Sequence, residues 1–260
     1  MGLTCQSCGR RGLKKRFNIK CNDEFVIALA GNPNVGKSTV FNALTGLKQH
    51  TGNWPGKTVV NTRGHFYFKN KKFVLMDLPG TYSLLANSVE EEVARDFICF
   101  GKPDATIVVA DATCLERNLN LVLQVMELTD NVILCINLID EAERKGIFID
   151  IKYLEKELGV PVVATVAREG KGLNELMERV YNVALGIEIP NPKKVIYSPD
   201  IEKAVEKIAP KIDEILKGKL SSRWVALRII DGDKSILNSI NEYIYGKKTI
   251  EIVGSRDIHD

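Results

Sequence analysis

The feature that most constrains this chain is a glycine-rich loop placed directly after an apolar run. Residues 25–30 are all apolar and have the length of a strand, and residues 37–44 have the character of a helix. Between and around them lie Gly31, Asn32, Pro33, Asn34, Val35, Gly36, Lys37, Ser38 and Thr39. Glycines let such a backbone curl so that several N–H groups face one anion, and the helix N-terminus adds a favourable dipole. The strand–loop–helix context therefore predicts a phosphate-binding loop; the alternative is a glycine turn that only caps a helix.

Two groups of residues support this interpretation, one in the loop itself and one later in the chain. Lys37 would reach the β- and γ-phosphates of a nucleotide, and Ser38 would bind Mg²⁺. Asp77-Leu78-Pro79-Gly80 ends a later apolar run, where the carboxylate can hold Mg²⁺ through water and the Gly80 N–H can meet a γ-phosphate. Alone, such a motif is a common turn. After a phosphate loop it indicates the second nucleotide motif.

Length and composition exclude several classes of protein. The chain has 260 residues, of which 45% are hydrophobic and 27% charged, with a formal net charge of +3. It is long enough for one sizeable domain plus a small one, and its charge is too small to indicate nucleic acid as a partner. No apolar run approaches the roughly 18 residues that span a bilayer, and the N-terminus lacks the pattern of a secretory signal. We therefore expect a soluble, intracellular chain.

The six cysteines do not have the pattern of a disulfide framework. Cys99, Cys114 and Cys135 lie in apolar company, where a free cysteine acts as a small hydrophobe. Cys5 and Cys8 form a C-x-x-C turn that can present two thiolates to one metal, but a closed zinc site takes about four ligands. Two interpretations stay open: a tail pair without an essential role, or a zinc site completed by a second chain or an absent segment.

Short β-branched runs alternate with amphipathic stretches from about residue 22 onward, which indicates an α/β fold with a mostly parallel sheet. The expected strands are 25–30, 64–69, 72–76, 105–110, 131–137 and 161–165. The expected helices are 37–44, 89–98, 115–128, 151–158, 172–185, 200–216, 223–230 and 234–245. A tight hairpin at Asn70 would give one antiparallel pair at the edge. We expect a basic extension with C-x-x-C at 1–21, an α/β domain at 22–188 and a small all-helical domain at 189–260.

A third motif, Asn137-Leu138-Ile139-Asp140, closes another apolar run. A carboxylate there can accept hydrogen bonds from both N1–H and the exocyclic amine of guanine, whereas adenine offers no such donor pair. By itself the motif could cap a helix that starts at Glu141. Coming third, after the phosphate loop and Asp-x-x-Gly, it selects guanine.

The three motifs together resemble those of the translation-factor-like GTPases, over about residues 24–185. The resemblance implies a Ras-like G domain that binds GTP and GDP with Mg²⁺. Two departures matter. Leu138 stands where these GTPases carry a lysine beneath the base, and Thr165-Val166-Ala167 form only a loose version of the fifth motif, whose backbone contacts guanine O6.

Hydrolysis is expected to be slow. Thr81 and Tyr82 stand where Ras-like enzymes place a glutamine that orients the attacking water. Asn34 lies inside the phosphate loop, and in similar GTPases an Asn there coordinates K⁺, which supplies positive charge in the transition state. We therefore expect K⁺-stimulated turnover; the alternative for Asn34 is a turn former.

The segment at 49–59 resembles the effector loop of the ferrous iron transport protein B family, whose signature G-N-W-P-G-x-T-V it repeats. The resemblance implies that Gly56, Lys57 and Thr58 lie at the nucleotide, with Thr58 closing on Mg²⁺ and the γ-phosphate. The glycines and the lack of apolar periodicity suggest a segment that orders only with ligand. Trp54 is interpreted as a loop residue.

Two further segments extend this resemblance to about residues 22–245. Residues 77–83 match the second switch of the family. Residues 223–233 resemble part of its helical domain, which in the family slows nucleotide release. A helix at 223–230 that packs on the G domain is a plainer interpretation, and both can hold.

The resemblance implies the cytosolic GTP-binding region of a ferrous iron transporter, at the cytoplasmic face of the cell membrane and continuous with a membrane-spanning remainder of the same polypeptide. The implied catalytic set is Asn34, Lys37, Thr58 and Gly80, with Ser38, Thr58 and Asp77 around Mg²⁺ and Asn34 at K⁺. A small accessory protein and a homo-oligomer stay open as partners. Two other functions also stay open: a soluble K⁺-stimulated GTPase of ribosome or tRNA maturation, and a GTP-gated switch with negligible hydrolysis.

Overall fold

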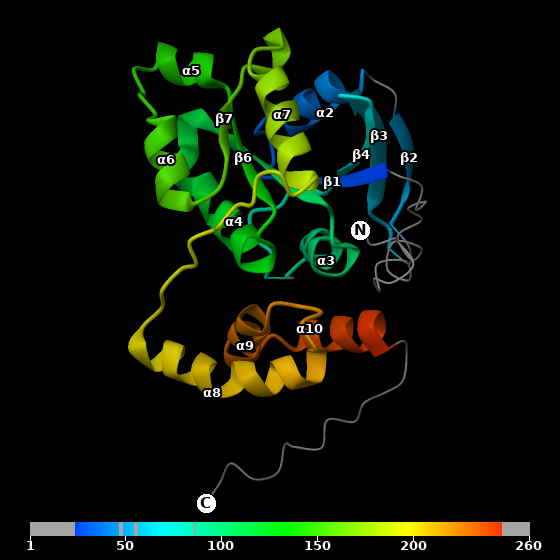
Figure 1. The fold of residues 1–260 in the computed structure, drawn as a ribbon, viewed down its shortest axis with the longest axis vertical. Helices are drawn as coiled ribbons and strands as arrows, with labels where there is room; N and C mark the ends of the chain where they lie inside the picture. The colour runs from blue at the N-terminus through cyan, green and yellow to red at the C-terminus, as the bar shows by residue number, and fades with distance from the viewer. Residues whose placement is uncertain (1–23, 47–48, 55–56, 86, 246–260) are drawn as a thin grey trace, which may run out of the picture.

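The protein is a seven-stranded sheet with helices on both faces, followed by a helical unit (Figure 1). The structure is a computed structural model, and it describes residues 24–46, 49–54, 57–85 and 87–245. The strands are β1 (Glu24–Gly31), β2 (Gln49–Asn53), β3 (Val60–Phe68), β4 (Lys71–Asp77), β5 (Ala105–Asp111), β6 (Val132–Asn137) and β7 (Val162–Ala164). The helices are α2 (Lys37–Thr45), α3 (Val89–Asp96), α4 (Leu115–Leu128), α5 (Ile139–Arg144), α6 (Ile151–Leu158), α7 (Leu173–Ala184), α8 (Pro199–Leu216), α9 (Ser222–Ile230) and α10 (Lys234–Ile240). The predicted fold class, a mostly parallel α/β sheet followed by helices, is confirmed.

The strand order brings several loops to one edge of the sheet. The order is β2-β3-β4-β1-β5-β6-β7, and the five strands from β4 to β7 in this order are parallel neighbours. In the register of β1 with β4, Leu29 lies opposite Asp77. Because the carboxyl ends of parallel strands meet at one edge, the segments that follow β1, β4, β6 and β7 lie close together there.

Apolar side chains form one core on each face of the sheet. Helices α2 and α7 cover one face, where Phe41 and Leu176 are buried. Helices α3 and α4 cover the other face, where Val93 and Leu121 are buried. The central strands are therefore enclosed on both sides, which explains why they have continuous apolar runs and no alternation.

The predicted hairpin at Asn70 is confirmed, but its expected place at the edge of the sheet is wrong. Lys69 and Asn70 have φ values of 45° and 59°, as a two-residue type I′ turn requires. β2 pairs with the outer side of β3, while β1 pairs with β4, so the hairpin lies inside the sheet. The sequence signal for β2 is weak, because Gln49–Asn53 contains no apolar residue and includes a glycine.

Two predicted helices are confirmed, but the last turn of each is π-helical rather than α-helical. α3 ends at Asp96 and continues as Phe97–Gly101, while α10 ends at Ile240 and continues as Asn241–Tyr245. These two turns bring the rings of Phe100 and Tyr243 into a stack, with their centroids 4.6 Å apart. The stack is one contact between the sheet unit and the helical unit.

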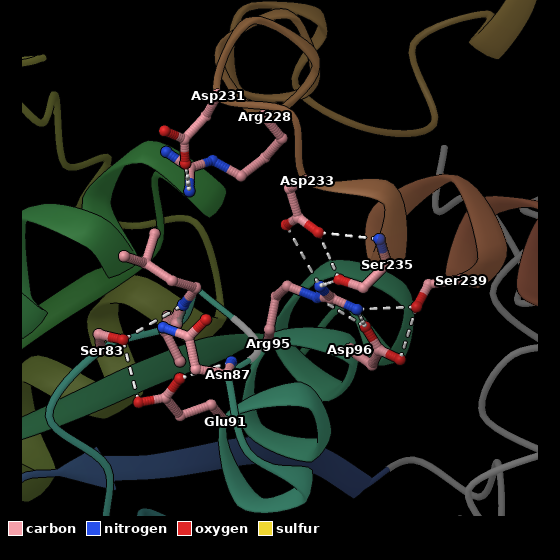
Figure 2. Close-up of polar contacts among 12 residues, drawn as sticks. Ser83, Asn87, Glu91, Arg95, Asp96, Arg228, Asp231, Asp233, Ser235 and Ser239 are labelled. Carbon is pink, nitrogen blue, oxygen red and sulfur yellow. Dashed lines mark hydrogen bonds and ion pairs between the residues drawn. The ribbon is translucent and has the colours of Figure 1, made fainter.

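A buried arginine makes another contact between the two units. Arg95 on α3 is 0% exposed, and Figure 2 shows its guanidinium group pointing toward α10. Its Nε donates to Asp96 Oδ1 at 2.9 Å and its Nη1 donates to Ser235 Oγ at 2.6 Å. Its Nη2 donates to Ser239 Oγ at 2.8 Å, and this hydroxyl donates to Asp96 Oδ2 at 3.0 Å. A buried charge is tolerated when it is paired and hydrogen-bonded, so this network holds α10 against α3.

The surroundings of the cysteines and the character of the helices can be compared with what the sequence predicted. Cys99 and Cys135 are buried, and burial raises the pKa of the Cys135 thiol to about 11. Cys114 is exposed, so the expectation of apolar surroundings for it is wrong. Cys5 and Cys8 lie outside the described residues. Within the described ranges, no helix has both the length and the apolar character needed to cross a bilayer.

Replacing Arg95 with methionine is expected to lower the free energy of unfolding by about 3–5 kcal/mol, because the Asp96 carboxylate stays buried without its partner. Lys69→Met is a matched control. It removes an ion pair with Glu178 whose two side chains are 49% and 41% exposed, and should cost about 1 kcal/mol or less. Urea unfolding followed by circular dichroism measures both changes, and equal losses in the two variants would contradict the assigned role of the Arg95 network.

Candidate functional site

The phosphate loop connects β1 to α2 and has a conformation that only its glycines permit. Gly36 has a φ of 82°, and a Cβ there would lie 2.4 Å from Asn137 Nδ2. A Cβ on Gly31 would lie 2.7 Å from the carbonyl oxygen of Val109. α2 begins at Lys37 without a side-chain cap. Its first N–H groups therefore suit an anion held by the loop.

The remaining side chains of the loop divide into buried and exposed groups. Val35 is buried in the core, while Ser38 and Thr39 are exposed. Asn32 is 3% exposed, and its Oδ1 has no hydrogen-bond partner among the described residues. Asn34 is exposed and has a φ of 66°, a left-handed conformation that asparagine adopts more readily than most residues. This conformation suits a turn former as well as a ligand, so the K⁺ role of Asn34 stays a prediction.

Lys37 and Asp77 form an ion pair next to the phosphate loop. Lys37 Nζ donates to Asp77 Oδ1, and the two side chains are 11% and 19% exposed. Burial raises the pKa of the Asp77 carboxyl above its usual value, while the Lys37 ammonium opposes this rise. The groups expected at the γ-phosphate and at Mg²⁺ thus lie together, and each neutralises the charge of the other.

Asn137 joins three segments of the site. Its Nδ2 donates to the Val35 carbonyl oxygen at 3.1 Å, which ties it to the phosphate loop. Its Oδ1 accepts from the Ala167 N–H at 3.1 Å and from Thr165 Oγ1 at 3.2 Å, which ties it to the segment after β7. Asn137 is 1% exposed. Asn137, predicted among the nucleotide contacts, therefore has its amide engaged within the protein, where it joins the phosphate loop to the segment after β7.

Asp140 lies in the first turn of α5, the short helix that the sequence offered only as an alternative explanation of the motif. Leu138 precedes it with a φ of 63°. Asp140 Oδ2 accepts from Arg144 Nη2 at 2.8 Å and also from Arg168 Nη2. Asp140 Oδ1 is buried and has no hydrogen-bond partner among the described residues. An unsatisfied buried acceptor costs free energy unless a ligand supplies the donor, and N1–H or the exocyclic amine of guanine fits this need.

The segment after β7 differs from the expectation for a guanine O6 site. The N–H of Thr165 donates to the Ile136 carbonyl oxygen at 2.8 Å, and the N–H of Val166 donates to the Lys171 carbonyl oxygen at 3.1 Å. The N–H of Ala167 donates to Asn137 Oδ1. All three N–H groups are engaged within the protein, so a contact with O6 would require one of them to change partner.

Trp54 anchors the segment that the sequence suggested would order only with ligand. It is 2% exposed and lies edge-on to Phe97, with the ring centroids 5.1 Å apart. Its backbone N–H donates to the Val59 carbonyl oxygen at 2.9 Å. The interpretation of Trp54 as a loop residue is therefore wrong, because its ring belongs to the core between the sheet and α3. A tryptophan among glycines and polar residues was the one signal of this role.

The other predicted residues of the two switch segments lie in different surroundings. Lys57 Nζ donates to Glu92 Oε2 on α3 at 2.7 Å, Thr58 is exposed, and Gly56 lies outside the described residues. A Cβ on Gly80 would lie 3.4 Å from Pro33 Cα, so the second switch touches the phosphate loop. Leu78, predicted among the nucleotide contacts, is buried in the core, and Pro79 beside it is half-buried.

Comparison with known families accounts for both parts of the chain. A family model described as Ferrous iron transport protein B matches residues 25–180, and a model described as FeoB cytosolic helical domain matches residues 197–255. This chain belongs to the ferrous iron transport protein B family. Its sheet unit corresponds to the G domain of FeoB proteins, and helices α8 to α10 lie within the residues matched by the helical-domain model. The resemblance drawn from the effector loop and from residues 223–233 is confirmed.

Several curated relatives share this region. The Fe(2+) transporter FeoB of Methanocaldococcus jannaschii is 45% identical over 215 residues, which are 82% of this chain and 31% of the relative. FeoB of Escherichia coli K12 is 37% identical over 216 residues, 81% of this chain and 27% of the relative. The Fe(2+) transport protein A/FeoB fusion protein of Porphyromonas gingivalis is 38% identical over 246 residues, 93% of this chain and 29% of the relative. The chain thus spans less than a third of the length of these relatives.

Solved FeoB structures have the same fold. The cytosolic domain of T. maritima FeoB in a GDP form has a TM-score of 0.76 at 39% identity, covering 84% of this chain and 86% of that one. The GMPPNP form of the same domain has a TM-score of 0.72 at 39% identity, covering 86% and 87%. The cytosolic domain of L. pneumophila FeoB has a TM-score of 0.76 at 32% identity, covering 86% and 90%. The predicted combination of a G domain and a helical domain is confirmed.

Asn137→Ala is expected to lower the free energy of unfolding by about 2–4 kcal/mol, because the Val35 carbonyl and the Ala167 N–H lose their partner inside the protein. Hydrogen exchange measured by mass spectrometry should show lost protection in the peptide around Ala167. Asn131→Ala is the matched control, since its amide donates to the Asp104 carbonyl oxygen at the opposite end of β6. Unchanged exchange near residue 167 in Asn137→Ala would show that the loops do not depend on this amide.

Proposed function

We propose that this chain is the guanine-nucleotide-binding and GTP-hydrolysing region of a membrane transporter for ferrous iron. Its membership of the FeoB family and the GDP and GMPPNP forms of a similar domain support this proposal. The single observation on this chain that carries the base assignment is the buried, unpartnered Oδ1 of Asp140 beside the segment that Asn137 fixes. The iron-conducting part would be the membrane-spanning remainder of the polypeptide, with this region at the cytoplasmic face. The proposed divisions are 22–188 for the G domain and 189–260 for the helical domain.

The phosphate end of the site would act through positioning and charge. Lys37 would leave Asp77 and bind the β- and γ-phosphates, an exchange of one anionic partner for another. Ser38, Asp77 and Thr58 would hold Mg²⁺, which neutralises charge on the phosphates when bound. Gly80 is close enough to the phosphate loop for its N–H to reach a γ-phosphate, because it already packs on Pro33. These groups bind and orient the nucleotide, and none of them abstracts a proton from the attacking water.

Slow hydrolysis follows from the second switch. Thr81 is buried, its N–H donates to the Gly31 carbonyl oxygen at 3.3 Å, and it offers no carboxamide to orient water. The ring of Tyr82 lies under the guanidinium group of Arg117, 4.5 Å from its central carbon, and so is held at the surface. Extra positive charge at the phosphates would then have to come from outside the side chains, and K⁺ at Asn34 supplies it in this proposal.

Both switch segments contact helix α3, and α3 contacts the helical domain. Lys57 pairs with Glu92, and Ser83 Oγ donates to Glu91 Oε1 at 3.0 Å, as Figure 2 shows for the second contact. From the same helix, Arg95 binds Ser235 and Ser239 on α10. A change at the γ-phosphate would therefore reach the helical domain through one helix. This path supports the proposal that nucleotide state is coupled to the transport pore.

The base assignment is tested by Asp140→Asn. The amide replaces one carboxylate acceptor with a donor, so GDP affinity should fall by about 100-fold, and xanthosine diphosphate, whose O2 accepts, should become the preferred ligand. Isothermal titration calorimetry with Mg²⁺ measures both. Glu141→Gln is the matched control, since Glu141 contacts the same two arginines and should keep the preference for GDP. Undiminished GDP binding by Asp140→Asn would refute the assignment, and indifference of the unaltered chain to GDP would refute the function.

The K⁺ role is tested by turnover of GTP in KCl and in NaCl. K⁺ should raise turnover by about tenfold or more over Na⁺, and Asn34→Ala should remove this difference while GDP still binds. Asn70→Ala is the matched control, because Asn70 is also an exposed asparagine with positive φ, but it lies in the β3–β4 turn. Equal turnover in the two salts would rule the K⁺ role out.

A further inference from the structure

The two oxygens of the Asp140 carboxylate have different surroundings. Oδ1 is buried and has no hydrogen-bond partner among the described residues. Oδ2 accepts from two guanidinium groups, those of Arg144 and Arg168. A carboxylate oxygen has two lone pairs. The two arginines therefore fill Oδ2, while Oδ1 still lacks a donor among the described residues.

Arg144 differs from Arg168 by a backbone contact with Asp140, although its side chain is the more exposed of the two, at 59%. It lies one turn after Asp140 on α5, and in addition to the side-chain contact its Nε donates to the Asp140 backbone oxygen at 3.2 Å. Arg168 comes from a different segment, directly after Ala167, and its side chain is 49% exposed. Its guanidinium group also lies 3.5 Å from Glu141 Oε1 and 3.9 Å from Glu169 Oε1. Both arginines have Glu141 as a second carboxylate, since Arg144 Nη2 lies 2.6 Å from Glu141 Oε1. Arg168 has Glu169 as a third carboxylate nearby.

Guanine needs both carboxylate oxygens, since it presents two donors, N1–H and the 2-amino group, side by side. One donor can use Oδ1, which lacks a partner among the described residues. The second donor meets Oδ2, where both lone pairs are taken. Binding of the complete guanine edge then requires one arginine to leave Oδ2, and Arg168 can move toward Glu141 and Glu169 when it does so.

We propose that Arg168 is a specificity-determining residue whose guanidinium group competes with the guanine 2-amino group for Asp140 Oδ2. The competition weakens guanine nucleotide binding and speeds release, and it reduces the advantage of guanine over hypoxanthine, which lacks the 2-amino group. This inference rests on the proposed function, in which Asp140 recognises the base. It assigns to the segment after β7 a role in base selection through a side chain rather than through its backbone.

The test compares GDP with inosine diphosphate, which keeps N1–H and O6 but has no 2-amino group. In Arg168→Gln, GDP should bind about two- to fivefold more tightly, the range expected for removal of an exposed ion pair. Inosine diphosphate should gain much less, so the ratio of the two dissociation constants should rise. Release of a fluorescent GDP analogue, followed by stopped flow, should slow by a similar factor.

Lys171→Gln is the matched control for the loss of positive charge. Lys171 lies three residues further along the same segment, is 72% exposed and pairs with Glu169 at 2.8 Å rather than with Asp140. Its replacement should shift GDP and inosine diphosphate together and leave their ratio unchanged. A ratio in Arg168→Gln equal to that of the unaltered chain, or lower, would overturn the proposal. If the unaltered chain binds neither nucleotide, the proposed function fails as well, so the two failures are distinguishable.

Discussion

The amide of Asn137 is the contact on which the arrangement of the nucleotide site depends. The segments after β1, β6 and β7 leave the same edge of the sheet, and strand pairing alone does not fix their relative positions. One buried side chain accepts from the segment after β7 and donates to the phosphate loop, so neither loop can shift without breaking a hydrogen bond that water cannot replace. The close approach of Gly36 to the same amide explains why the loop needs a glycine there.

The charged groups of the site are paired with one another. Lys37 pairs with Asp77 at the phosphate end, and Asp140 pairs with Arg168 at the base end. A nucleotide would displace the internal partner at both ends, so its net affinity reflects an exchange of ionic contacts rather than a simple gain. This arrangement favours moderate affinity and rapid exchange. It also keeps the partly buried carboxylate of Asp77 compensated by a positive charge.

Helix α3 connects elements that are far apart in the sequence. It receives the ring of Trp54 on its π-helical extension, pairs with Lys57 from the first switch and contacts Ser83 from the second. Its Arg95 forms the buried contact with α10. Because the Arg95 network is buried and joins the two helices through several hydrogen bonds, α3 and α10 should move as one body, and the stack of Phe100 on Tyr243 reinforces this.

The sequence by itself determined the fold class, the three nucleotide motifs and the family, because phosphate and base recognition require particular residue types at fixed spacings near strand ends. It also located the turn at Asn70, where two residues adopt positive φ. It could not show β2, which is polar and is held by pairing with β3, nor the burial of Trp54 and Arg95. Those features depend on contacts between residues distant in the chain. Only the tertiary structure brought Arg168 to Asp140 and α3 to α10, since no local pattern records which side chain will lie opposite which.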